Sequence, residues 1–186
     1  MGQRTERFFE RGKNFFEAGN NEQALRLFNQ VLNREPGHKG ALKHKALLFT
    51  ASEEPQKTEQ FLDIALTQQP EDDELQQIAG AFYISINEFE QAEDYLKQSV
   101  QFNDRNALAH YGLGLICVRH YSDHSRAIKH FDKAIAHDAE FSEALFNRAC
   151  SSMIVGATEK AKRDFQTAKK LNHPEAEEML NNYFDS

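Results

Sequence analysis

Residues 107–138 read ALAHYGLGLICVRHYSDHSRAIKHFDKAIAHD, and this stretch decides the fold. Ala127 is followed by Phe131 four residues later and by Ala134 three residues after that. Spacings of three and four place side chains on one face of a helix. The same order of residue types returns along the chain at intervals of about 34 residues, a repetition typical of proteins that stack copies of one unit.

Proline marks the period of this repetition. Pro36 and Pro70 each end a polar stretch and lie 34 residues apart, and one further step reaches the polar break at Asp104. Each period contains two apolar stripes at helical spacing with a short polar turn between them. One such hairpin cannot bury both of its faces, so neighbouring hairpins must share their apolar surfaces.

The turns carry residues that start helices. Asn20 and Asn87 are expected to cap the second helices of their units, with Gln23 and Glu90 as reciprocal partners. Pro55 is expected at the first position of another second helix. The fourth unit has one additional residue, which we place in the turn 120–125 because the apolar faces on both sides stay in phase.

These features resemble the tetratricopeptide repeat family, whose 34-residue unit is a pair of antiparallel helices. A small residue at the eighth position of the unit is matched in all five units, and Thr58, Leu62 and Leu96 depart from the pattern at later positions. The matches are Gly12, Ala46, Gly80, Gly114 and Ala149 at position eight, Ala24, Ala92, Ala127 and Ala161 at position twenty, and Phe28, Phe131 and Phe165 at position twenty-four.

The resemblance implies an all-α fold, a right-handed α-solenoid of five helix-turn-helix repeats plus a C-terminal capping helix. The whole chain, residues 1–186, then forms a single superhelical domain. The repeats span about 5–38, 39–72, 73–106, 107–141 and 142–175, and the capping helix spans 174–184.

In this family the first helix of each pair lines a concave groove, at about the second, fifth, ninth and twelfth positions of the unit. The resemblance therefore implies a peptide-binding groove lined mainly by apolar side chains, and apolar strips on a protein surface usually mark binding sites. The alternative is that the superhelix closes or that the terminal helix covers the strip. The implied residues are Phe9, Lys13, Phe16, Lys43, Leu47, Gln77, Ile84, Tyr111, Leu115, Val118, Phe146, Cys150 and Met153.

The predicted function is a protein–protein interaction adaptor that holds a peptide or helix of a partner protein in this groove. Two alternatives remain open: a self-assembling scaffold that forms a homo-oligomer, and a dedicated chaperone for an exported protein, as small members of the family serve in bacterial secretion. Some members clamp a carboxylate with Lys, Asn and Arg, but here only Asn147-Arg148 matches a fragment of that pattern. The partner itself is not identified by any residue.

Catalytic and metal-binding motifs are not found in the sequence. Gly-x-Ser-x-Gly, His-Glu-x-x-His, Cys-x-x-Cys and a glycine-rich phosphate loop are all missing, so we expect no enzyme and no cofactor. His120 and His124 straddle a predicted turn with Asp123 between them, and no metal site is expected there. The other three histidines of this region, His110, His130 and His137, are expected to end or flank helices.

The formal charge of −7 is unevenly distributed. Residues 1–50 hold nine basic and five acidic side chains, whereas residues 51–106 hold three basic and thirteen acidic ones. The acidic middle is typical of solvated helix faces, and the alternative is that it attracts a basic segment of a partner. It argues against nucleic acid, which selects a basic stripe.

The chain also lacks an apolar run long enough to span a bilayer and an apolar stretch typical of a secretion signal, so a cytoplasmic location is expected. Cys117 and Cys150 are 33 residues apart, about one repeat, and are expected to be reduced thiols on neighbouring units.

Overall fold

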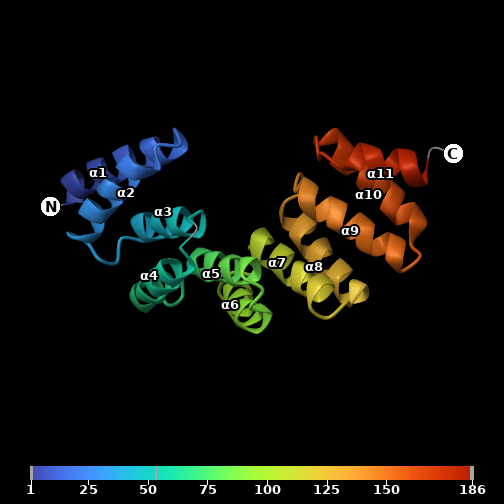
Figure 1. The fold of residues 1–186 in the computed structure, drawn as a ribbon, viewed down its shortest axis with the longest axis horizontal. Helices are drawn as coiled ribbons and strands as arrows, with labels where there is room; N and C mark the ends of the chain where they lie inside the picture. The colour runs from blue at the N-terminus through green and yellow to red at the C-terminus, as the bar shows by residue number, and fades with distance from the viewer. Residues whose placement is uncertain (1, 53, 185–186) are drawn as a thin grey trace.

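Eleven α-helices follow one another in the part of the chain that the computed structural model describes, residues 2–52 and 54–184. They form five successive hairpins and a final single helix, which confirms the all-α solenoid. Figure 1 shows the hairpins arranged as an arch, with the two chain ends on its two arms. The hairpins are α1 (Gly2–Glu17) with α2 (Asn21–Leu32), α3 (Lys39–Thr50) with α4 (Pro55–Gln68), α5 (Asp73–Ser85) with α6 (Phe89–Phe102), α7 (Ala107–Arg119) with α8 (His124–His137), and α9 (Ser142–Ile154) with α10 (Thr158–Lys170), and the final helix is α11 (Ala176–Tyr183).

Side-chain caps start several of these helices. The Asn20 side chain accepts a hydrogen bond from the backbone N–H of Gln23 at 3.3 Å, and Pro55 occupies the first turn of α4, as the sequence predicts. The prediction for Asn87 is wrong, because the cap position of α6 is Glu88 and carries no side-chain hydrogen bond. Asn87 instead lies inside the turn with a φ of 63°.

A residue in the left-handed conformation is found in several of the turns between paired helices. Gly19, Asn87 and Gly156 have positive φ, and the residue after each donates its N–H to a carbonyl five positions back at 2.8–2.9 Å. In the fourth hairpin the left-handed residue is Ser122, and the N–H of Asp123 reaches six positions back at 2.8 Å. The additional residue of this unit therefore enlarges the turn by one place while the same type of closure is kept.

The two helices of a hairpin approach closely where small residues face large ones. A Cβ atom added to Gly12 would lie 2.7 Å from the ring of Phe28, and one added to Gly80 would lie 2.5 Å from Leu96. At Gly114 the added atom would overlap the ring of Phe131. Full burial of such a large apolar side chain stabilises the fold by about 2–3 kcal/mol, so each crossing is a local centre of stability.

Thr58, which departs from the small-residue pattern, is accommodated by a hydrogen bond. Its side chain is 1% exposed, and its hydroxyl donates to the carbonyl of Phe49 at 2.9 Å, at the end of the preceding helix. A buried hydroxyl with a partner avoids the desolvation cost that an unpaired one would carry.

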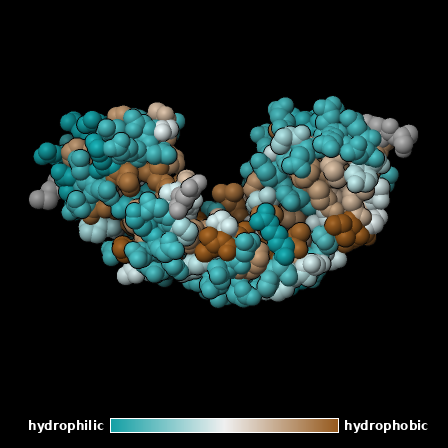
Figure 2. All heavy atoms as spheres, in the orientation of Figure 1, coloured by the Kyte–Doolittle hydropathy of each residue, from teal (hydrophilic) through white to brown (hydrophobic). Residues whose placement is uncertain are grey.

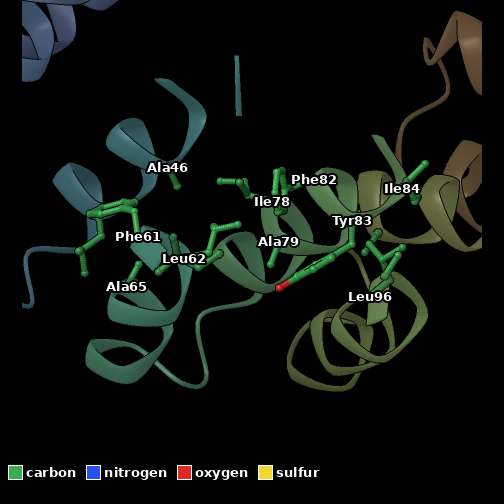
Figure 3. Packing of buried hydrophobic residues seen from close by; sticks show 14 of the residues in the cluster. Ala46, Phe61, Leu62, Ala65, Ile78, Ala79, Phe82, Tyr83, Ile84 and Leu96 are labelled. Carbon is green, nitrogen blue, oxygen red and sulfur yellow. The ribbon is translucent and has the colours of Figure 1, made fainter. Parts of the chain in front are cut away.

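One apolar core runs through the middle of the arch from α3 to α7. Figure 3 shows Leu62 of α4 and Ile78 of α5 extending into the space between two successive hairpins, and Leu96 of α6 packs into the same cluster. Smaller clusters centred on Phe28, Phe131 and Phe165 continue the core toward both ends, so each hairpin packs on its neighbours.

A partly buried ion network joins three helices near the C-terminal end. The Arg148 guanidinium of α9 donates two hydrogen bonds to the Asp164 carboxylate of α10, at 2.7 and 2.8 Å, and a third to Asp132 of α8 at 2.6 Å. Asp164 is 6% exposed. Bidentate geometry compensates for the desolvation of both charges only while both partners are present.

We expect a Gly114→Val substitution to lower the free energy of unfolding by about 1–3 kcal/mol, because the new side chain must displace the Phe131 ring. Urea unfolding followed by circular dichroism measures the loss. Ala81→Val, at an exposed position of α5, is the matched control and should cost about 0.5 kcal/mol. Equal losses in both variants would contradict the close crossing.

Replacement of Arg148 by Met should cost about 3–5 kcal/mol, because it leaves the Asp164 carboxylate buried without its partner. The control is Arg26→Met, which removes an exposed pair with Glu22 and should cost roughly 0.5 kcal/mol or less. The same urea titration compares the two, and similar losses would mean that the Arg148 network contributes no more than a surface pair.

Candidate functional site

The first helices of the first four hairpins form a continuous row, because α1 contacts α3, α3 contacts α5, and α5 contacts α7. In Figure 1, α3, α5 and α7 lie toward the opening of the arch and α4 and α6 lie on its outer side. Figure 2 shows this opening as a wide hollow, with brown apolar atoms on its floor.

Twelve of the thirteen side chains that the sequence predicts for the groove are partly buried. Ile84 is the exception, because it is 7% exposed and belongs to the central core. The other twelve are half-buried: Phe9, Lys13, Phe16, Lys43, Leu47, Gln77, Tyr111, Leu115, Val118, Phe146, Cys150 and Met153. Side chains in this range have one side on the core and the other at the surface.

The apolar members gather on α7 and α9. Tyr111, Leu115 and Val118 rest on the buried cluster around Phe131, and Phe146, Cys150 and Met153 rest on the cluster around Phe165. The two groups are joined by a hydrogen bond of 3.2 Å from the Asn147 amide on α9 to the hydroxyl of Tyr111 on α7. We call these six side chains the α7–α9 strip.

The N-terminal members are used largely in packing between hairpins. The rings of Phe9 and Phe16 meet the imidazole of His44 edge-on, at centroid distances of 5.5 and 5.3 Å. The cations are already paired: Lys13 lies 3.7 Å from Glu17, and Lys43 lies 2.5 Å from Glu74 on the next first helix. The structure therefore pairs Lys43 with Glu74. The positive charges of the two predicted groove lysines, Lys13 and Lys43, are both offset by nearby carboxylates.

Leu108 is a surface residue that sequence reasoning did not select. It is 53% exposed at the second position of its unit, a position that faces the inner side in the family pattern, so its phase was an available signal. It lines a small pocket of about 280 Å³ together with Glu74 and Gln77. Ala81, in the next turn of α5, is also exposed.

Acidic side chains occupy the same second position in three other units. Glu6, Glu74 and Glu143 are exposed there, next to the row of half-buried residues. Glu74 is paired with Lys43 and Glu6 lies 3.6 Å from His38, so Glu143 is the one of the three that lies on the same helix as part of the α7–α9 strip and has no cation within ion-pair distance among the described residues.

The residues that could have suggested a carboxylate clamp are engaged elsewhere. Arg148 is held by Asp164 and Asp132, and the Asn147 amide donates to the carbonyl of Glu143 as well as to Tyr111. Both side chains therefore have partners within the protein.

His120 and His124 are also separated by their contacts. His120 lies 3.2 Å from Glu90, whereas the Nδ1 of His124 lies 3.3 Å from the hydroxyl of Ser151. The three histidines expected to end or flank helices differ from one another. His137 is the last residue of α8 and is exposed, and His110 is on the first turn of α7 and is 1% exposed. The expectation is wrong for His130, which lies in the middle of α8.

Burial also changes the acidity of groups in the strip. It raises the pKa of the Cys150 thiol to about 11, and the nearby negative charge of Glu175 adds to this effect. Burial likewise raises the pKa of Tyr111, and the charge of Glu143 contributes. Both cysteines are free, and Cys117 is fully buried, as expected for reduced thiols.

Comparison with known proteins identifies the class. The sequence matches the tetratricopeptide repeat family over residues 9–73 and 83–136, more than half of the chain, and the protein belongs to that family. Proteins of this family are typically non-catalytic modules that bind other proteins. A search of curated proteins gave no match.

Several solved structures share the fold. The crystal structure of MamA protein aligns with a TM-score of 0.67 at 23% identity and covers 99% of this chain and 97% of that one. PilF of Pseudomonas aeruginosa aligns with a TM-score of 0.81 at 17% identity over 89% of this chain and 75% of that one. YrrB, described as a TPR protein with an unusual peptide-binding site, aligns with a TM-score of 0.65 at 17% identity over 94% of this chain and 90% of that one. None of the helices described in this chain is both long and apolar enough to cross a membrane.

We expect iodoacetamide to modify Cys150 roughly tenfold more slowly than a short unstructured cysteine peptide at pH 8. A pKa of about 11 leaves about one thiol in a thousand ionised, and this loss outweighs the greater nucleophilicity of the more basic thiolate. Mass spectrometry of the Cys150 peptide over time measures the rate. In urea the two rates should converge, and a fast reaction in the folded protein would contradict the burial of this thiol.

Proposed function

We propose that this protein is an adaptor that holds a peptide or helix of a partner protein on the inner side of the arch. The observation that carries the proposal is the α7–α9 strip, six half-buried side chains joined across two first helices by the Asn147–Tyr111 hydrogen bond. A partner that covers these side chains would remove their remaining apolar surface from water, which is the main driving force for association.

The chemistry of the strip defines the ligand. Tyr111, Phe146 and Met153 offer two aromatic rings and a flexible thioether, which suit apolar anchor residues of a helix or an extended segment. Glu143 on α9 is exposed, so a basic residue between the anchors would gain a favourable electrostatic interaction. The proposed ligand is therefore an apolar segment that also carries Lys or Arg.

The hairpin geometry supports a binding surface that is formed in advance. The six strip residues are held by the buried clusters beneath them, so the surface is formed before a ligand arrives and little order has to be created on binding. The peptide-binding site named for YrrB belongs to a protein of the same fold and is an independent reason to test peptides here.

The test starts from peptides selected on the folded protein from a random phage-displayed library. We expect selected peptides to contain apolar and basic residues, and to lose at least about tenfold in affinity for a Leu108→Ser, Ala81→Trp double variant. Leu108 and Ala81 are exposed on α7 and α5, so these changes alter the inner surface without disturbing the core. Fluorescence polarisation with labelled peptides gives the dissociation constants.

The matched control is Ile64→Ser, which removes a 58% exposed apolar side chain from α4 on the outer side of the arch. It should leave peptide affinity unchanged. Equal peptide affinities for the unsubstituted protein, the double variant and Ile64→Ser would refute binding on the inner side of the arch. The alternative is that a second copy of the chain covers this surface, and light scattering over a dilution series tests it. A stable dimer that is lost in the Leu108→Ser, Ala81→Trp variant would show that the surface mediates self-association.

A further inference from the structure

Three side chains that can coordinate metals meet at the junction of the third and fourth hairpins. Asp104 lies in the loop between α6 and α7, His110 is on the first turn of α7, and His137 is the last residue of α8. One ligand atom from each lies within 4.8 Å of the other two, and across residues 2–52 and 54–184 this is the one group of three that does so. We propose that these three side chains form a binding site for a divalent metal ion of the zinc class.

The distances within the cluster suit such an ion. The Nε2 atom of His110 is 3.3 Å from Oδ1 of Asp104. Zinc bonds of about 2.0 Å in a tetrahedron place neighbouring ligand atoms roughly 3.3 Å apart, so this pair already has the required separation. The rings of His110 and His137 are 6.1 Å apart at an angle of 22°, and His137 is exposed at the end of α8.

Two imidazoles and one carboxylate are a donor set that zinc favours, and three protein ligands leave one position for water. His110 supplies the fixed part of the site, because it is 1% exposed and packed inside the fold. Its Nε2 is also 3.0 Å from the backbone carbonyl of Asp104, and its Nδ1 has no hydrogen-bond partner among the described residues. Binding at Nε2 would shift the ring proton to Nδ1 and keep the imidazole neutral, the form that coordinates metals.

Lys133 is a built-in competitor for the ion. Its ammonium lies 3.3 Å from the same Asp104 oxygen, and both side chains are exposed. A metal ion must displace this ammonium to reach the carboxylate. Removal of the Lys133 ammonium should therefore increase the affinity for the metal ion. Nonspecific zinc binding by surface histidines elsewhere would not respond to this change.

Occupancy would couple two hairpins. Asp104 follows α6 of the third hairpin, whereas His137 ends α8 of the fourth, so one ion would tie the connecting loop to the far end of the next hairpin. Cross-links of this kind stabilise the folded state because they bind it and not the unfolded chain. His110 directly precedes Tyr111 of the α7–α9 strip in the sequence, but the metal site does not depend on the proposed function.

Calorimetric titration of the metal-free 186-residue chain with Zn²⁺ tests the site. We expect one ion per chain, and a loss of at least about tenfold in affinity in His137→Gln and in Asp104→Asn, both of which change exposed side chains. Lys133→Gln should bind severalfold more tightly. At a hundredfold excess of zinc over its dissociation constant, the melting temperature of the unsubstituted chain should rise by roughly 5–10 °C.

The control is His120→Gln, which removes a histidine from an exposed His–Glu pair that lacks a third ligand, and it should change neither affinity nor the thermal shift. Zinc binding that is unaffected by His137→Gln and Asp104→Asn, or that is lost equally in His120→Gln, would overturn the proposal. A titration in which zinc shows no binding to the unsubstituted chain would also overturn the proposal. His110→Asn is left for confirmation, since the two exposed variants decide the question even if this buried change unfolds the protein.

Discussion

The arrangement depends on the close approach of two helices within each hairpin. That approach requires a residue almost without a side chain on the first helix opposite a large apolar side chain on the second, as with Gly114 and Phe131 or Gly80 and Leu96. Because protein interiors are packed nearly as densely as crystals, the pair sets the distance between the helices. The same distance then sets how each hairpin presents its outer faces to its neighbours.

Stacking of hairpins explains why the inner surface consists of half-buried residues. Each hairpin has two faces to cover, and its neighbours cover most but not all of the first helix. Tyr111 and Phe146 therefore contact the buried clusters and stay partly buried, and the Phe146 ring also stacks on His173 at a centroid distance of 4.1 Å. A surface built in this way is apolar and rigid at the same time, and this combination suits recognition of another chain.

The periodicity of the sequence predicted most of the fold. A prediction was wrong where one residue type suits two different structural positions. Asn87 followed three residues later by Glu90 matches a capping pattern, yet the turn needs a residue with positive φ at that place, and Asn tolerates this conformation. The cluster of Asp104, His110 and His137 could not be read from spacing, because its members come from a loop and two helices and meet only when the third and fourth hairpins stack.

The sequence by itself determined the helices, their pairing and the small-against-large crossings, because these depend on contacts within one repeating unit. Only the tertiary structure decided how deeply each inner side chain lies: Ile84 belongs to the core, whereas Leu108 is left half exposed. It also decided that Lys43 and Arg148 are neutralised by carboxylates of other helices. Burial and ion pairing of this kind depend on the packing angle between successive hairpins. The position of a residue within its repeat unit does not specify that angle.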